Sequence, residues 1–279
     1  MPLPSFYLSK WYFDAVDENG RAFIGYAGEI SWKGFRATYT SLLIHNGSGV
    51  ERSEFRMHHV SMPEHDKEKN TLSWDDARFG ISAKWAAAAP PLSVRLFENA
   101  EGCVDWHCFF PQARAALIRE NGAPLDGRGY AEQLEITCLP WQIPLGQLRW
   151  GRFLSEKYCL IWIEWRADSP RQWVFLNGVA VKNALVGDDA VVLPEQQMRL
   201  VLDRSGKLAA GKKILQIAGS LLSVLPGFKQ LAPARFLYAV ERKWRSRGLL
   251  YEKDTLAGEG WAIHELVDFT GSHRETTNT

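Results

Sequence analysis

The chain has 279 residues, and its 33 lysine and arginine side chains are balanced by 32 acidic ones. A chain of this length can bury a sizeable core in one large domain or two medium ones. The balanced charge excludes a strongly basic surface of the kind that recruits nucleic acid. With 23% charged and 46% hydrophobic residues, the composition is that of an ordinary folded globular protein.

Short strands separated by tight turns account for most of the chain. Turn-forming residues interrupt the apolar runs at 17–20, 46–47, 121–122 and 177–178, and each of these turns contains an Asn-Gly pair. Asn-Gly favours a two-residue hairpin because both central residues of a type I′ turn need positive φ. The strands predicted in chain order are 11–16, 21–30, 39–45, 50–60, 78–85, 93–98, 103–110, 113–119, 127–137, 148–153, 158–165, 172–176, 198–202, 236–242 and 260–269. The spacing leaves little room for crossover helices, so the sheets are expected to be antiparallel and to form barrels or sandwiches.

Two further features organise the chain. Turn-forming residues cluster at 120–127 and predict a boundary there, which gives domains of residues 1–122 and 123–279. Residues 206–225 have helical spacing, with Ile214, Ile217, Leu221 and Leu222 on one face. Basic residues surround this segment, so one interpretation is an interfacial helix that contacts a membrane through residues 206–229. The alternative is a helix that packs on the protein's own sheet.

Other classes of site have no sequence support. The four cysteines, Cys103, Cys108, Cys138 and Cys159, form no Cys-x-x-Cys pair, so neither a zinc site nor a disulfide framework is expected. Residues 1–13 lack the apolar run of a secretion signal, and no segment approaches the roughly 20 apolar residues of a membrane span. Neither a nucleotide-binding glycine motif nor a serine nucleophile elbow is present. We therefore expect a cytoplasmic protein without metal or cofactor.

The segment Gly127–Thr137 contains the most informative side chain. In a strand, alternate residues share a face, so Tyr130, Glu132, Leu134 and Ile136 lie together. Glu132 is the only carboxyl on this apolar face, and the loss of hydration there raises its pKa. A carboxyl that stays protonated near neutral pH can act as a general acid, and Tyr130 can orient a substrate beside it. The alternative is an ion pair with Arg128, Arg149 or Arg152, which would make Glu132 a structural strut.

Aromatic and histidine residues supply further candidates. Arg152 shares a face with Trp150, where its guanidinium can stack on the indole or pair with Glu132. Trp150, Trp162 and Trp165 are predicted to line a hydrophobic cavity, and ordinary core packing is the alternative for them. His107 and Asp105 also share a face. They could form a base oriented by a carboxylate, or they could lie on a solvated surface of the sheet.

Gly129–Glu135 and Leu148–Arg152 carry a resemblance to a known superfamily. They resemble the Gly-Tyr-x-Asp-His-x-Trp-Gly strand and the Trp-x-Trp-Gly-Arg-like segment of lipocalin-like carotenoid 1,2-hydratases and Diels–Alderases. Trp11-Tyr12-Phe13 is similar to the opening Trp-Tyr-Phe of these proteins, which adds Trp11 to the candidate substrate-binding residues. The resemblance implies two tandem lipocalin-like barrels with an active cavity in or between them. It also places Glu132 at the position of the proton-donating aspartate, and Gln133 at that of the histidine.

The sequence thus predicts an all-β fold of two tandem lipocalin-like antiparallel β-barrels, with one amphipathic helix in the second half. The predicted function is a cofactor-independent enzyme that holds a hydrophobic unsaturated molecule, such as an isoprenoid or polyene, in an aromatic cavity. Glu132 would promote its cyclisation, isomerisation or hydration. The alternatives are a non-catalytic carrier and an interaction module with filled barrels. Cavity volume distinguishes the last, because drug-sized pockets exceed about 300 Å³.

Overall fold

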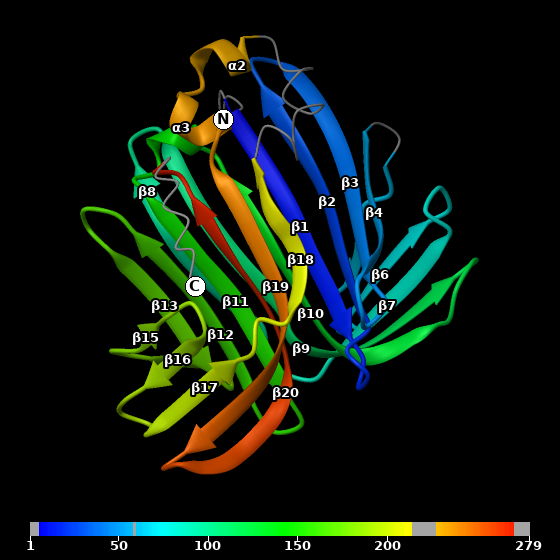
Figure 1. Cartoon of the computed structure of the whole chain (residues 1–279). Coiled ribbons are helices and arrows are strands. Elements are labelled where there is room, and N and C mark those ends of the chain that lie inside the picture. The colour runs from blue at the N-terminus through cyan, green and yellow to red at the C-terminus, as the bar shows by residue number, and fades with distance from the viewer. Residues whose placement is uncertain (1–5, 58–59, 214–226, 271–279) are drawn as a thin grey trace.

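A computed structural model describes residues 6–57, 60–213 and 227–270 of the chain, which form two antiparallel sheets of ten strands each (Figure 1). The first sheet consists of β1 (Phe6–Val16), β2 (Ala22–Trp32), β3 (Phe35–His45), β4 (Val50–Met57), β5 (Glu64–Asp66), β6 (Thr71–Asp76), β7 (Ile81–Ala87), β8 (Leu92–Asn99), β9 (Gly102–Arg119) and β10 (Leu125–Ile136). The second consists of β11 (Gln147–Ser155), β12 (Cys159–Arg166), β13 (Arg171–Leu176), β14 (Val179–Val181), β15 (Leu185–Val186), β16 (Ala190–Leu193), β17 (Met198–Leu202), β18 (Gly206–Lys213), β19 (Val240–Glu252) and β20 (Thr255–Asp268). The short helices η1 (Pro140–Gln142), α2 (Phe228–Leu231) and α3 (Ala234–Leu237) complete the described elements.

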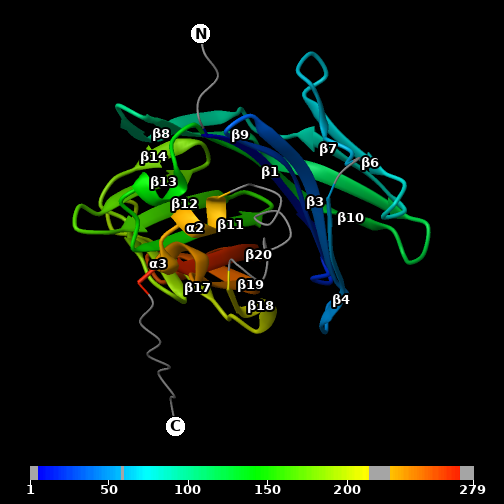
Figure 2. The same ribbon diagram turned by 90° about the horizontal axis from the view of Figure 1, so that it is seen from above.

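The two sheets repeat one topology. The first runs in the order β4-β3-β2-β1-β10-β9-β7-β6-β5 with β8 paired to β9, and the second runs β14-β13-β12-β11-β20-β19-β17-β16-β15 with β18 paired to β19. Each strand of the first sheet therefore has a counterpart ten places later. This duplication and the strong curvature of both sheets, which is visible from above in Figure 2, confirm the predicted pair of tandem lipocalin-like barrels.

Alternation along the strands creates three hydrophobic clusters. Phe13 and its neighbours on one face of the first sheet pack around Trp74 and Trp85 in that sheet's own interior. Phe153 belongs to the corresponding interior of the second sheet. The third cluster lies between the sheets and includes Tyr12. Because Tyr12 and Phe13 are consecutive in β1, they point to opposite faces, and one strand serves both a barrel core and the interface.

The turn signals predicted the hairpins correctly. The turns at 17–20, 46–47, 121–122 and 177–178 join antiparallel pairs, and both Asn177 and Gly178 have positive φ, at 50° and 82°. The two strands predicted at 103–110 and 113–119 are one strand, β9, because Pro111 lies where the pairing with β10 shifts register. A bulge of this kind tolerates a proline that has no N–H to donate.

The change from one sheet to the other falls later than the predicted boundary between residues 122 and 123. β10, which begins at Leu125, lies between β1 and β9 in the first sheet. The cluster of turn-forming residues at 120–127 is the hairpin that joins β9 to β10, so it turns the chain without leaving the sheet. The second sheet begins at Gln147 with β11.

The predicted helix at 206–225 is wrong over its first residues. Gly206–Lys213 is strand β18, which pairs with β19 through two register shifts. Pairing with a neighbouring strand overrides a helical spacing that has no other support. The apolar positions from Ile214 to Leu222 lie outside the described residues. Similarly, the first residues of the strand predicted at 236–242 belong to helix α3, and β19 starts at Val240. In the part of the chain that is described, no helix has the length and hydrophobicity to cross a membrane.

Candidate active site

The sheets meet along two rows of side chains that face each other. In the first sheet, Glu132 (β10), Tyr12 (β1) and Tyr26 (β2) are directly opposite one another on adjacent strands. In the second sheet, Trp150 (β11), Glu265 (β20) and Lys243 (β19) form a similar row, in which Trp150 and Glu265 correspond to Tyr12 and Glu132. Tyr12 and Trp150 touch edge to face, with ring centroids 4.8 Å apart. We call these six residues the floor, because a cavity lies on one side of them.

Glu132 receives its hydrogen bonds on one oxygen only. The indole N–H groups of Trp106 and Trp150 donate to Oε2 at 2.5 and 3.2 Å, and the Tyr130 hydroxyl donates to the same atom. Glu132 is 7% exposed and lines the cavity. Among the described residues, Oε1 has no hydrogen-bond partner. The carboxyl is therefore held by one oxygen, and the residue lies in the cavity wall.

Burial controls the protonation of Glu132. Loss of hydration raises the pKa of Glu132, while the donors Tyr130, Trp106 and Trp150 and the charge of Lys10 lower it, and the net shift is upward. No arginine among the described residues pairs with this carboxyl. Because the three donors occupy Oε2, the proton of the acid form belongs on Oε1. The predicted apolar-face carboxyl is thus found in the environment that a general acid needs.

An ionic cluster occupies the other end of the floor. The Lys243 ammonium contacts Glu265 Oε2 at 2.7 Å and Glu241 Oε1 at 3.0 Å, and it donates to the Tyr26 hydroxyl oxygen. Burial lowers the pKa of Lys243, but the two carboxylates outweigh burial and raise it above its ordinary value. Burial raises the pKa of Glu241, yet Lys243 brings it below its usual range. The pKa shifts of Lys243 and Glu241 thus favour their charged forms, whereas that of Glu132 favours its neutral form.

Below the floor, a buried ion pair closes the interface. Arg152, which follows Trp150 on the same face of β11, has no exposed surface and binds Asp14 of β1 through two hydrogen bonds, at 2.5 and 3.1 Å. The prediction that Arg152 stacks on Trp150 in the cavity or pairs with Glu132 is wrong, because Asp14 binds two of its guanidinium nitrogens and holds it away from both. The strut considered for Glu132 exists, but Asp14 and Arg152 form it.

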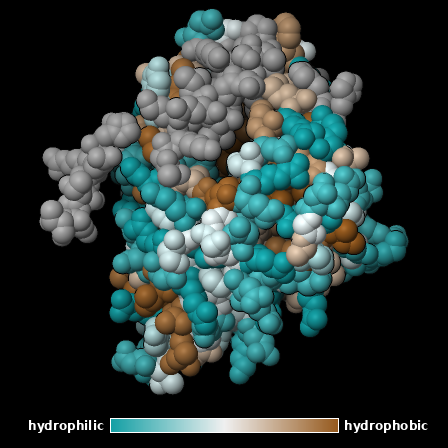
Figure 3. Space-filling view, turned by 45° about the vertical axis from the view of Figure 1, so that its right-hand side comes forward, coloured by the Kyte–Doolittle hydropathy of each residue, from teal (hydrophilic) through white to brown (hydrophobic). Residues whose placement is uncertain are grey.

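The cavity above the floor has a volume of about 460 Å³ and is lined by both sheets and by α3. Its wall is largely apolar, and Trp150 and Trp165 belong to it as predicted. Trp11 and Trp162 do not, because each points into the interior of its own barrel. Tyr130 is fully buried behind Glu132 and reaches the cavity only through its hydrogen bond to that carboxyl. Figure 3 shows hydrophobic side chains recessed between hydrophilic ones on one face of the molecule.

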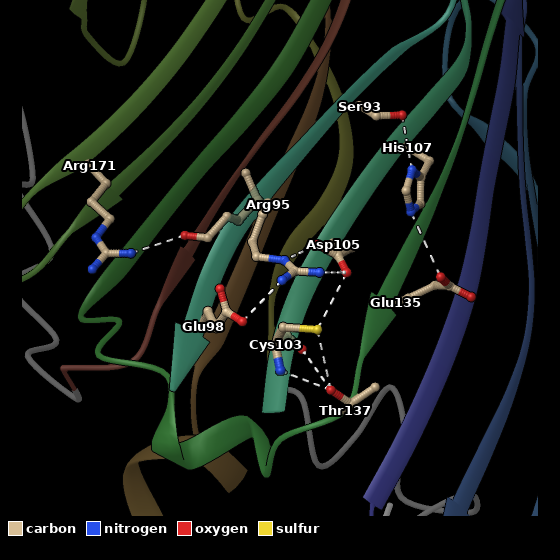
Figure 4. Close-up of polar contacts among 10 residues, drawn as sticks. Ser93, Arg95, Glu98, Cys103, Asp105, His107, Glu135, Thr137 and Arg171 are labelled. Carbon is tan, nitrogen blue, oxygen red and sulfur yellow. Dashed lines mark hydrogen bonds and ion pairs between the residues drawn. The ribbon is translucent and has the colours of Figure 1, made fainter. Parts of the chain in front are cut away.

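His107 and Asp105 lie on the opposite face of β9 from Trp106 and form no oriented base (Figure 4). Asp105 is bound by Arg95 at 2.8 and 3.1 Å, and this hydrogen bonding lowers the pKa of Asp105. His107 instead approaches Ser93 at 3.0 Å and Glu135 at 3.8 Å. These side chains are partly exposed, in agreement with the alternative of a polar strand surface.

Several residues of the site were not predicted. Trp106 donates a hydrogen bond to Glu132. The cavity is also lined by Lys10, Tyr26, Glu241, Lys243 and Glu265. Alternation gave a partial signal for Trp106, which shares a face with Val104 and Cys108. Glu241 and Lys243 come from a segment whose strand was expected to end at residue 242. Among the described residues, no group of three histidine, cysteine, aspartate or glutamate side chains is placed to hold a metal, and all four cysteines are free.

Comparison with solved structures agrees with this architecture. The crystal structure of CghA is similar over 96% of this chain and 90% of its own, with a TM-score of 0.62 and 14% sequence identity. CghA with Sch210972 gives a TM-score of 0.55 at 12% identity, covering 96% of this chain and 90% of that one. Kievitone hydratase from Nectria haematococca gives 0.51 at 11% identity, covering 95% and 89%. No protein-family model and no curated protein sequence matches the chain. At these identities the likeness establishes a shared fold, which confirms the predicted lipocalin-like architecture.

Proposed function

We propose that the protein is an enzyme that binds a hydrophobic, unsaturated small molecule between its two barrels and uses Glu132 as a general acid. This proposal is supported by the asymmetry of the buried carboxyl, which receives three donors on Oε2 and belongs to a residue of the cavity wall. A cavity of about 460 Å³ exceeds the lower limit of about 300 Å³ for drug-sized ligands. Proton donation to a double bond or a carbonyl is the chemistry that such a group performs.

The product of this donation depends on how the ligand is held. Protonation of an alkene leaves a cation, which adds water, loses a proton elsewhere or closes a ring. A cyclisation without charge needs only one polarising hydrogen bond and a cavity that holds one folded conformer. The aromatic faces of Trp150 and Trp165 can stabilise positive charge in the first case. Two of the similar structures are named kievitone hydratase and CghA with Sch210972, and the first name states a hydration.

The test compares wild type, Glu132→Gln and Glu135→Gln, each purified from the same cells and extracted for mass spectrometry of bound small molecules. The amide introduced by E132Q keeps acceptor capacity for Trp106 and Trp150 but cannot donate an acidic proton. We expect E132Q to retain a compound that wild type converts to an isomer or to its hydrate, with turnover reduced by about 10²- to 10⁴-fold. Glu135 lies on the opposite face of the same strand, so E135Q should behave as wild type.

A non-catalytic carrier predicts a different result. Wild type and E132Q would then release the same unchanged compound in similar amounts, and no conversion would be found when the extracted compound is returned to the wild-type protein. That outcome would overturn the enzymatic proposal while leaving the cavity as a binding site.

A further inference from the structure

Lys10 is a cation in the cavity wall without a direct counter-ion. It lies on β1 two residues before Tyr12, one row above the floor, and its directly opposite neighbours are Leu134 and Gly28. Both neighbours lack a polar side chain. In the described part of the chain, Lys10 forms no ion pair, whereas the Lys243 ammonium is shared among Glu241, Glu265 and Tyr26. Lys10 therefore has hydrogen-bond donors to offer and Lys243 has none.

The charged groups around Lys10 leave a positive excess when Glu132 is protonated. The described cavity wall contains three cations, Lys10, Arg235 and Lys243, and three carboxyl groups, Glu132, Glu241 and Glu265. With Glu132 neutral, three positive charges face two negative ones. Glu241 and Glu265 are both held by Lys243. An anion that enters the cavity would restore the balance of charge.

Tyr26 offers a second donor beside Lys10. The Lys10 Nζ atom is 5.5 Å from the centroid of the Tyr26 ring. Because Lys243 donates to the Tyr26 oxygen, the hydroxyl hydrogen of Tyr26 is directed elsewhere, and burial keeps the phenol protonated by raising its pKa. Donation from the ammonium also polarises the O–H bond. Two donors from adjacent strands thus line the same apolar cavity.

We propose that Lys10 and Tyr26 bind the oxyanion head of the substrate, a carboxylate or an enolate, while its apolar body fills the rest of the cavity. This inference rests on the proposed function of the same site and adds a substrate class, an acidic unsaturated amphiphile. Lys10 and Glu132 lie diagonally across neighbouring strands, a separation of roughly 7–8 Å between backbones. The head would therefore be anchored a short distance from the acid that acts on the body.

Binding of such a head has a consequence for Glu132. Lys10 lowers the pKa of Glu132, and an anion on Lys10 would cancel this pull. The bound substrate would then favour the protonated form of the acid that it needs. Glu241, Glu265, Lys243 and Arg235 lie in the same wall.

The proposal can be tested with cis-parinaric acid and its methyl ester, two fluorescent polyenes that differ only in the head. Their binding is measured by fluorescence titration of the full chain, as wild type, Lys10→Met, Lys33→Met and Glu132→Gln. Met keeps the apolar length of lysine and removes its charge. Lys33 is an exposed lysine at the turn between β2 and β3, beside Trp32, so K33M controls for net charge.

We expect K10M to weaken binding of the acid by about tenfold or more and binding of the ester by less than about twofold. K33M should change neither. Equal losses for acid and ester, no loss for either, or no binding of the acid by wild type would overturn the anchoring role. Melting temperatures of the variants identify any general loss of folding, and the unchanged ester affinity is the internal control for an intact cavity.

This test separates the inference from the function on which it rests. E132Q should bind both probes at least as well as wild type, because Glu132 is not the anchor. If K10M fails to discriminate the probes while E132Q still abolishes turnover of the natural compound, the acid role stands and the head subsite is wrong. If K10M discriminates but E132Q is fully active, the subsite stands and the catalytic role is wrong.

Discussion

Glu132 and Glu265 occupy the same place in the two repeats, and they differ in what surrounds them. Each lies on the strand of its sheet that comes last along the chain. It is directly opposite an aromatic residue of the strand that comes first along the chain, Tyr12 or Trp150. Glu265 meets the Lys243 ammonium at 2.7 Å. Glu132 meets only neutral N–H and O–H donors. Glu265 is therefore committed to an ion pair, whereas Glu132 remains able to gain and lose a proton.

The row below the floor extends this comparison. Asp14 and Arg152 also occupy equivalent places, on β1 and β11, and they bind each other without any exposed surface. Burial raises the pKa of Asp14, and the guanidinium of Arg152 opposes this rise. Duplication of one sheet thus brings equivalent positions face to face. Asp14 and Arg152 carry opposite charges and close the interface. Glu132, Trp150 and Glu265 line the cavity.

The largest effect is expected from breaking the buried ion pair between Asp14 and Arg152. Asp14→Asn or Arg152→Met leaves one charge buried without a partner, which costs about 3–5 kcal/mol of unfolding free energy. Urea unfolding measures this difference. The double variant should recover much of the loss, because replacing a buried pair by neutral groups is far less costly than breaking it.

Arg247→Met is the matched control for the variants of the Asp14–Arg152 pair. Its partner Glu259 is also on the second sheet, but the two side chains are 56% and 40% exposed, so the loss should stay below about 1 kcal/mol. Equal losses of unfolding free energy for R152M and R247M would show that the Asp14–Arg152 pair does not stabilise the interface.

A smaller effect concerns the dependence of stability on the protonation of Glu132. Because the folded-state pKa of Glu132 is raised, its stabilising contribution is complete below the unfolded pKa of about 4.3 and is lost as pH rises through the folded value. The unfolding free energy of wild type relative to E132Q should therefore fall with rising pH, by about 1.4 kcal/mol per unit of pKa shift. Urea unfolding between pH 4 and pH 9 measures the difference. A difference that rises with pH would mean that Glu132 is a stabilised carboxylate.

The smallest effect concerns Trp150, one of the three hydrogen-bond donors to Glu132. Trp150→Phe keeps the ring that packs against Tyr12 but removes the N–H that donates to Glu132 at 3.2 Å. Since that bond favours the charged carboxyl, its loss should raise the pKa of Glu132 further. The same stability titration detects the shift as a steeper loss toward alkaline pH. Trp165→Phe, which changes the cavity wall without a bond to Glu132, should leave the profile unchanged.

Local rules predicted the strands and the face of Glu132, and they could not predict its partners. Asn-Gly turns and alternation depend on neighbouring residues, so the hairpins and the Tyr130–Ile136 face were correct. The sequence neighbours of Glu132 suggested Arg152, but the pair that forms joins residues 14 and 152 across two sheets. Lys243 and Tyr26 meet only after the sheets dock, and no spacing in the sequence records that contact. Trp150 and Trp165 line the cavity, whereas Trp11 and Trp162 lie in the barrel interiors. Alternation fixes the face of a strand but does not say whether that face lines a barrel interior or the interface.

The most direct measurement is the titration of the Glu132 carboxyl itself. Carbon-13 NMR of protein labelled at the glutamate side-chain carboxyl, with the resonance assigned by its absence in E132Q, gives the pKa of this group in the folded state. We predict a midpoint above the ordinary value of about 4.3. A Glu132 midpoint at or below the ordinary value would contradict its role as a proton donor in the cavity.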